Sequence, residues 1–316
     1  TLDHLTSASK PGTLRVREAV VDHQLAGRVA IVTGAGRGLG RCHALALGAA
    51  GADVVVNDLG SSLDGGGRDT GPAQRVVEEI KAAGGRAVAS THDVADWEAA
   101  EALVDLALAE FGDLNVLVNN AGILRDQTLA KLDAASWDAV IRVHLRGHAA
   151  PTHHAAAHWR AAAKSGSNVR ASVIHTSSAS AWGGNFGQAA YAAAKMGVIG
   201  LSRVLVAELG HLGVRSNVIG PAASTRMGGM AEEALVAGPY DPAAIGPLMV
   251  WLAREDCPAT DQVIHAYGDR IVLLEMPAVA HDLRAPGGRW SVQELDAALP
   301  DRLVQRRPLS YFMEPS

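Results

Sequence analysis

Two side chains four residues apart, Tyr191 and Lys195, are the residues in this sequence most able to do chemistry. The stretch around them, Ala189 to Gly210, has helical character, and residues four apart on a helix share one face. A lysine ammonium near a phenol stabilises the phenolate, which lowers the tyrosine pKa from about 10 towards neutral pH. Such a tyrosine could act as a general acid or base on an alcohol or carbonyl oxygen.

A serine supports this interpretation. Ser178 comes thirteen residues before Tyr191, directly after an expected strand. Its hydroxyl could hold the same substrate oxygen as the phenol, and capping of a loop is the alternative role. We assign the capping role to the neighbouring Ser177 and Ser180. A tyrosine and a lysine at this spacing also occur by chance on exposed helices, so the pair alone would not indicate catalysis.

A glycine-rich turn indicates where a cofactor could bind. The expected strand Val29 to Thr33 runs straight into the segment Thr33 to Gly40, and a helix follows. Glycines permit a tight turn and a close backbone approach, and the helix N-terminus offers free N–H groups to a pyrophosphate. The spacing fits a TGxxxGxG pattern, whose fixed positions are Thr33, Gly34, Gly38 and Gly40. A plain strand-to-helix turn is the alternative.

The end of the next strand bears on the type of dinucleotide. Asp58 follows this strand, about 20 residues past the glycines, where a carboxylate can accept both hydrogen bonds of an adenosine ribose diol. Arg37, inside the turn, could instead pair with a 2′-phosphate. A buried like-charge encounter costs more than an optional surface pairing contributes, so we expect NAD rather than NADP. A solvated carboxylate and a solvated cation are the alternatives for these two residues.

Alternating β-branched runs and alanine-rich helical stretches must position these residues. This alternation from Arg28 to about Gly268 is typical of βαβ units. The expected strands are Val29 to Thr33, Asp53 to Asn57, Ala87 to Ser90, Val116 to Asn119, Ser172 to His175, Val214 to Ile219 and Val263 to His265. The expected helices include Gly40 to Ala50, Ala73 to Ala83, Trp97 to Phe111, Ala134 to Ala163 and Gln188 to Leu209.

The fold class predicted from this pattern is α/β, with a single doubly wound Rossmann domain and a seven-stranded parallel sheet. We place this domain at residues 28–268. Residues 1–27 form an N-terminal arm, and residues 269–316 form a C-terminal extension with one short helical pattern, Ser291 to Ala298. The extension is too short for a core of its own.

Composition limits the partners. The 316 residues are 48% hydrophobic and carry a formal net charge of −5, without the basic excess that nucleic-acid binding requires. We find neither a run of about 18 apolar residues nor a signal peptide, and expect no membrane partner. Cys42 and Cys257 lie far apart, which argues against a disulfide framework and a metal site and fits a cytoplasmic protein.

Taken in order, the motifs resemble those of the short-chain dehydrogenases/reductases. Besides the glycine turn, Ser178, Tyr191 and Lys195, the matching elements are Asp93-Val94, Asn119-Asn120-Ala121-Gly122 and Asn217-Val218-Ile219-Gly220-Pro221. The resemblance implies an oxidoreductase in which hydride passes between the nicotinamide and the substrate carbon while Tyr191 moves the proton. It also implies cofactor contacts by Gly34, Arg37, Gly38, Leu39, Gly40, Asp58, Asp93, Val94, Asn120, Ala121, Gly122, Tyr191, Lys195, Pro221 and Thr225.

Two positions depart from the family pattern. Where the family usually has an asparagine that supports a water-mediated proton relay to the lysine, this chain has His144. We therefore add His144 to the catalytic candidates Ser178, Tyr191 and Lys195, with a hydrogen-bonded core histidine as the alternative. Pro221 is followed by Ala222 rather than the usual glycine.

Several longer segments are similar to a narrower group, the (3R)-hydroxyacyl-CoA dehydrogenase part of peroxisomal multifunctional enzymes, also called 17β-hydroxysteroid dehydrogenase type 4. These segments are Val54 to Gly60, Gly65 to Gly67, Asn119 to Asp126, Arg142 to Gly147 and Asn185 to Gln188. The similarity implies an NAD-dependent enzyme acting on acyl-CoA thioesters, and we expect a stand-alone relative of it.

The resulting expectation is NAD-dependent oxidation of a secondary alcohol, with a 3-hydroxyacyl-CoA as substrate. A steroid alcohol as substrate and the reduction of a 3-oxoacyl thioester are alternatives within the same family. A nonenzymatic NAD-sensing scaffold is the alternative from another class, because a fold does not fix a function. The resemblance further implies a homodimer or homotetramer assembled through the helices Ala134 to Ala163 and Gln188 to Leu209.

Overall fold

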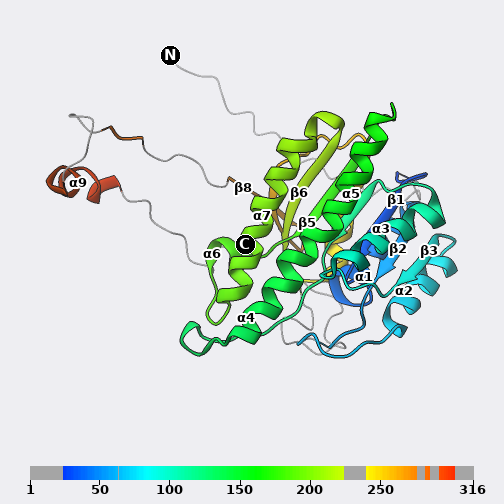
Figure 1. The fold of residues 1–316 in the computed structure, drawn as a ribbon, viewed down its shortest axis with the longest axis horizontal. Helices are drawn as coiled ribbons and strands as arrows, with labels where there is room; N and C mark the ends of the chain where they lie inside the picture. The colour runs from blue at the N-terminus through cyan, green and yellow to red at the C-terminus, as the bar shows by residue number, and fades with distance from the viewer. Residues whose placement is uncertain (1–23, 63, 224–239, 276–281, 285–291, 303–316) are drawn as a thin grey trace, which may run out of the picture.

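The computed structural model describes residues 24–62, 64–223, 240–275, 282–284 and 292–302. Their centre is an eight-stranded sheet with the strand order β3-β2-β1-β4-β5-β6-β7-β8 (Figure 1). The strands are β1 Val29–Thr33, β2 Asp53–Asn57, β3 Arg86–Ser90, β4 Val116–Asn119, β5 Ala171–Thr176, β6 Val214–Pro221, β7 Val263–Tyr267 and β8 Arg270–Leu274. All neighbouring pairs are parallel except β7 and β8.

Helices cover both faces of the sheet. They include α1 Gly38–Ala49, α2 Gly71–Ala82, α3 Trp97–Phe111, α4 Ala134–Ile141, α5 Gly147–Lys164, α6 Ala179–Gly183, α7 Ala189–Leu209 and α8 Gly246–Ala253. The described residues also contain the short helix α9 Val292–Ala298, which is not one of the helices that cover the sheet. Strand β1 shows why two layers form, because Ala30 and Val32 pack towards α1, α2 and α8, whereas Val29 and Ile31 pack towards α3, α5 and α7. A strand buried on both faces needs the continuous apolar run that the sequence contains.

The predicted doubly wound α/β fold is confirmed, with one difference in the strand count. The predicted sheet had seven parallel strands, and the eighth, β8, comes from the segment assigned to the C-terminal extension. It pairs with β7 through a two-residue turn, Gly268-Asp269, in which Gly268 has a φ of +51°. Glycine in such a turn is a hairpin signal, and β8 shows the alternating exposure of an edge strand.

The helix predicted over Ala134 to Ala163 is wrong as a single element. It is divided into α4, a π-helical segment η2 at Arg142–Arg146, and α5. Pro151, in the second turn of α5, has no N–H for a bond to the carbonyl four residues back, so the regular ladder is interrupted close to η2. The predicted helix in the extension matches α9, and its first residue, Ser291, lies outside the described residues.

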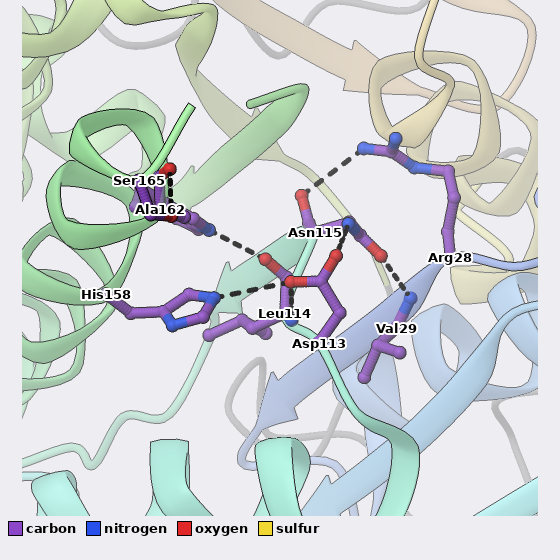
Figure 2. Close-up of polar contacts among 9 residues, drawn as sticks. Arg28, Val29, Asp113, Leu114, Asn115, His158, Ala162 and Ser165 are labelled. Carbon is purple, nitrogen blue, oxygen red and sulfur yellow. Dashed lines mark hydrogen bonds and ion pairs between the residues drawn. The ribbon is translucent and has the colours of Figure 1, made fainter. Parts of the chain in front are cut away.

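A polar network fixes the amino-terminal edge of the sheet (Figure 2). The Asn115 side chain accepts a hydrogen bond from the Val29 amide at 2.8 Å, and its amide group donates to Asp113 at 2.8 Å. Arg28 donates to the Asn115 carbonyl at 3.3 Å. These contacts align β1 with β4, which places the carboxyl ends of both strands next to each other at the opposite edge.

Helix α7 is long and apolar. The segment Ala189–Leu212 is the one helix among the described residues that is long and apolar enough to cross a membrane. It packs against β5 and β6, and Lys195 and Ser202 are among its buried residues. A core helix can have the same composition, so the expectation that no membrane partner exists stays a prediction.

Candidate active site

The glycine turn is tied to the loop after β4 at the carboxyl edge of the sheet. The Thr33 hydroxyl accepts hydrogen bonds from the amides of Asn120 at 2.9 Å and Ala121 at 3.1 Å. The Asn120 side chain donates to the carbonyls of Thr33 at 3.0 Å and Gly34 at 3.2 Å. The predicted neighbours Asn120 and Ala121 therefore meet the glycine turn, whereas Gly122 lies against His144.

The turn has no room for a side chain at Gly34 or Gly40, and its backbone angles favour glycine at Gly34 and Gly38. Gly34 and Gly38 have positive φ angles of +62° and +53°, which L-residues rarely adopt. A Cβ at Gly40 would lie 2.1 Å from the Gly34 carbonyl oxygen. Arg37 and Leu39 are partly exposed at the start of α1. This glycine cradle at a helix N-terminus fits the pyrophosphate of a dinucleotide.

Asp58 is held where the sequence predicted it, at the end of β2. One carboxylate oxygen accepts the Gly36 amide and the other accepts the Gly60 amide, both at 2.7 Å. Each oxygen keeps a further lone pair for another donor. The carboxylate is thus oriented beside the glycine turn, as recognition of a ribose diol requires.

Asp93 and Val94 follow β3 on the same edge. Val94 is buried, and Asp93 accepts hydrogen bonds from the Ala95 amide at 2.9 Å and from Arg142 at 2.8 Å. Burial alone would raise the Asp93 pKa, but the bonds from Arg142 and Ala95 outweigh it and the pKa is lowered. Asp93 is therefore ionised and held in place at this edge, and its contact with adenine stays a prediction.

The serine, tyrosine and lysine come together as predicted. Ser178 ends the loop after β5 and is hydrogen-bonded to Tyr191. The Lys195 ammonium lies 5.7 Å from the centroid of the Tyr191 ring and donates to the Thr176 carbonyl at 2.6 Å. Lys195 is only 2% exposed, so this rare buried amine is held between α7 and the end of β5.

The roles assigned to the flanking serines are wrong. Ser178 itself is the helix cap, because its hydroxyl accepts the Ser180 amide at 3.2 Å. The Ser177 hydroxyl instead donates to the Lys195 carbonyl at 2.8 Å, and the Ser180 hydroxyl donates to the Gln188 side chain at 2.8 Å. Ser177 therefore attaches α7 to the loop after β5, and Ser180 attaches α6 to the residue just before α7, which places Tyr191 near Ser178.

The electrostatics differ from the expectation of an acidic phenol. Burial raises the Tyr191 pKa, the bond with Ser178 lowers it, and the charge of Asp126 raises it, with a net increase. Burial lowers the Lys195 pKa to about 7. The expected lowering of the tyrosine pKa is thus not found, because burial of the phenol itself, the largest effect on its pKa, disfavours the phenolate.

His144 is both a core residue and a neighbour of the tyrosine. Its Nε2 lies 2.7 Å from the Ile123 carbonyl oxygen and 3.0 Å from the Ile123 amide. Its ring contacts Tyr191 edge to face, with centroids 5.0 Å apart. Burial and then the charge of Lys195 lower its pKa well below the ordinary value, so the ring is neutral. A Cβ on Gly122 would lie 2.4 Å from this ring, which explains the glycine.

The last two predicted residues are Pro221, at the end of β6, and Thr225, further along the chain. Pro221 ends this strand and is partly exposed, and the Ala222 amide continues the pairing by donating to the Ala266 carbonyl at 2.9 Å. Thr225 lies outside the described residues. Its contact with the nicotinamide stays a prediction.

One network beside the site was missed by the sequence analysis. Gln188, just before α7, donates to Asp126 at 2.9 Å and accepts from Asn185 at 3.1 Å and Ser180. The Gln127 amide also donates to the Gly187 carbonyl at 2.8 Å. These bonds join the loop after β4 to the start of α7. Asp126 and Gln188 lie in the segments Asn119 to Asp126 and Asn185 to Gln188. The similarity of these segments to other proteins was the sequence signal for this network.

Comparisons with known proteins agree with this geometry. Residues 28–234 match the family model for short chain dehydrogenase. The chain is 40% identical over 301 residues to a protein of Mycobacterium tuberculosis named hydroxyacyl-CoA dehydrogenase ChsB1, covering 91% of this chain and 92% of that protein. It is 43% identical over 231 residues to mouse peroxisomal multifunctional enzyme type 2, covering 73% of this chain and 30% of that protein.

A solved structure extends the match to three dimensions. A short chain dehydrogenase from Mycobacterium avium superposes with a TM-score of 0.80 at 44% identity, covering 90% of this chain and 97% of that one. The glycine cradle and the Ser178, Tyr191 and Lys195 group lie at the edge where such folds bind dinucleotides. The chain belongs to the short-chain dehydrogenase family, and is an oxidoreductase that acts on CH–OH groups with a nicotinamide dinucleotide.

Proposed function

We propose that this chain is an NAD-dependent dehydrogenase that converts a 3-hydroxyacyl-CoA to the 3-oxoacyl-CoA. The observation that carries the proposal is the group of Ser178, Tyr191 and Lys195 beside the glycine cradle at one sheet edge. The choice of substrate is supported by the match over nine tenths of both chains to a protein named hydroxyacyl-CoA dehydrogenase.

Each residue of the site would have its own role in cofactor binding or in the reaction. The backbone amides at the start of α1 would hold the pyrophosphate, and Asp58 would hold the adenosine ribose. When bound, the nicotinamide supplies the acceptor for the hydride leaving the alcohol carbon. Ser178 would hold the alcohol oxygen, and Tyr191 as phenolate would take its proton as the carbonyl forms. Lys195 would orient the nicotinamide ribose and stabilise the phenolate.

A substrate panel tests this proposal directly. The purified chain is mixed with NAD and with 3-hydroxyacyl-CoAs, steroid alcohols or simple secondary alcohols, and NADH absorbance is recorded. We expect the highest kcat/KM for a 3-hydroxyacyl-CoA. A steroid alcohol as the best substrate would contradict the substrate assignment, and no turnover of any alcohol alongside NADH binding would favour a binding protein.

Asp58→Ala tests the preference for NAD. We expect the ratio of kcat/KM for NAD over NADP to fall at least about tenfold, because a hydrogen bond to a charged group contributes about 1.5–3 kcal/mol and the repulsion of a 2′-phosphate disappears. Asp53→Asn is the matched control, since Asp53 lies at the opposite end of β2 and pairs with Arg86 at 2.8 Å. Equal use of both cofactors by the unaltered chain would contradict the assignment.

We also propose a homodimer or homotetramer that forms through α5 and α7. These helices lie side by side on one face (Figure 1), and α7 exposes Met196 by 39% and Val204 by 54%. Burial of such apolar side chains favours association. Light scattering of the purified chain tests the assembly, and a monomer at micromolar concentration would contradict it.

We propose a cytoplasmic location, which the free thiols of Cys42 and Cys257 support.

A further inference from the structure

Helix α6, which begins directly after Ser178, carries one large side chain. Its five residues are Ala179, Ser180, Ala181, Trp182 and Gly183. A helix of this length is not stable by itself, so its position depends on contacts with the rest of the fold. Ser178 is its N-cap and Trp182 lies about one turn further along, so whatever holds the indole also limits where the serine can lie.

The indole of Trp182 lies in a notch at the carboxyl end of β6. The notch exists because residue 220, near the end of this strand, is glycine. A Cβ on Gly220 would lie 2.3 Å from Cη2 of the indole, 3.1 Å from Cζ2 and 3.3 Å from Cζ3. Interiors are close-packed, so any larger residue at this position would have to displace the outer ring of the indole.

Strand β7 forms another side of the notch. Nδ1 of His265 lies 2.6 Å from the Gly220 carbonyl oxygen, so this nitrogen carries the proton and donates it to the carbonyl. The His265 ring meets the indole edge to face, with centroids 6.0 Å apart and planes at 75°, an arrangement that aromatic pairs favour. The indole also packs on a small buried cluster from α7, β6 and β7, namely Ile199, Val218 and Val263.

Ser178 is bonded both to α6 and to the catalytic tyrosine. Its hydroxyl accepts the Ser180 amide at 3.2 Å and is also hydrogen-bonded to Tyr191. Tyr191 belongs to α7, which packs separately against β5 and β6. A shift of α6 relative to β6 would therefore move the serine oxygen relative to the phenol.

We propose that Trp182 is a positioning residue, whose indole in the notch at Gly220 holds α6 against β6 and β7 and so keeps the Ser178 hydroxyl against Tyr191. The effect on turnover rests on the proposed function, whereas the placement of Ser178 does not. Such placement matters for the rate, because a displacement of about 1 Å can lower the rate of an enzyme about a hundredfold.

The test crowds the notch and then relieves it. Gly220→Ala places a methyl group 2.3 Å from the indole. We expect kcat, for the best alcohol of the substrate panel, to fall at least about tenfold while the NADH affinity is retained. Trp182→Phe lacks the three indole atoms that this methyl would meet. In Gly220→Ala combined with Trp182→Phe, kcat should therefore return to within about threefold of its value in Trp182→Phe alone.

A pH profile separates displacement of the serine from a general loss of stability. Burial raises the Tyr191 pKa and the bond with Ser178 lowers it, so loss of this bond should raise the pKa further. Because the phenolate is the base in the oxidation, we expect the rise of kcat with pH to move up by about one unit in Gly220→Ala and to return in the double variant. The other titratable groups facing the phenol are unaltered in every variant, namely Lys195, His144 and Asp126.

Gly85→Ala is the matched control. A Cβ there would lie 2.8 Å from Cγ2 of Ile80, a comparable clash at the opposite edge of the sheet, just before β3. This variant should lose stability but keep kcat and its pH profile. Unchanged kcat in Gly220→Ala, no recovery in the double variant, or a loss of NADH affinity equal to the loss of turnover would overturn the proposal.

Trp182→Ala tests the same role even if Gly220→Ala does not fold, because it empties the notch instead of crowding it. We expect a similar fall in kcat and a similar move of the pH profile, with the NADH affinity retained, and unchanged kcat would overturn the proposal. A crystal structure of Trp182→Ala needs no substrate. We expect the Ser178 hydroxyl to have lost its bond to Tyr191, and an unmoved hydroxyl would overturn the proposal even if the panel finds no turnover.

Discussion

Tyr191→Phe is expected to lower turnover at least about a hundredfold while NADH binding is retained, in keeping with the usual contribution of general acid–base catalysis. The substitution removes only the hydroxyl. The ring that packs edge to face on His144, with centroids 5.0 Å apart, stays in place. Neither the glycine cradle nor Asp58 contacts the lost oxygen in the described contacts. Steady-state kinetics gives kcat, and a fluorescence titration gives the NADH affinity.

The turnover and the NADH affinity together separate a loss of proton transfer from a loss of cofactor binding. Near-normal turnover in Tyr191→Phe would contradict the assignment of the proton transfer to this phenol. Loss of NADH binding together with turnover would show that the phenol supports the cleft rather than the reaction. The expected combination, slow turnover with intact binding, is specific to a group that acts on the substrate oxygen.

Gly40→Ala is expected to weaken dinucleotide binding more than tenfold and to lower the free energy of unfolding by about 1–3 kcal/mol, the usual range for overpacking. The added Cβ would lie 2.1 Å from the Gly34 carbonyl oxygen and 2.5 Å from the Asn120 amide nitrogen. The carbonyl belongs to the turn itself, and the Asn120 side chain ties the turn to the loop after β4, so relief of the clash must open the cradle. Calorimetry measures the affinity, and thermal denaturation measures the stability.

Gly210→Ala is the matched control for this substitution. Gly210 has helical backbone angles after α7, and a Cβ there would meet only Val206, at an ordinary distance of 3.6 Å. An alanine at a compatible helical position should leave stability unchanged or increase it by up to about 1 kcal/mol. Unchanged NADH affinity in Gly40→Ala would contradict the placement of the pyrophosphate in this turn.

The parts of the fold that follow from local pattern could be predicted from the sequence. The strand leading into the glycine turn, the carboxylate at the end of β2 and the helix carrying Tyr191 and Lys195 all lie where the residue types and spacing indicated. Each depends on near neighbours in the chain. In parallel sheets the strand ends meet at one edge, so a correct strand order already brings these residues together.

The remaining features depend on contacts that no local pattern contains. The interruption of the long helix at η2 combines a proline in the following helix with His144, whose partner is the distant Ile123. The raised Tyr191 pKa depends on how deeply α7 packs against β5. The buried contact between the side chains of Asn119 on β4 and His175 on β5 joins residues that are 56 positions apart. Strand β8 left a clear local signal, the Gly268-Asp269 turn, which was interpreted as the end of the domain.

The central claim is that the Tyr191 phenol meets the reacting oxygen beside the bound nicotinamide. A crystal structure of the chain with NAD and a 3-oxoacyl-CoA, a pair that cannot react, tests it most directly. We predict the Tyr191 hydroxyl and the Ser178 hydroxyl within about 3 Å of the keto oxygen, with the keto carbon facing the nicotinamide. A keto oxygen bound away from Tyr191, or a dinucleotide bound away from the glycine cradle, would contradict the account.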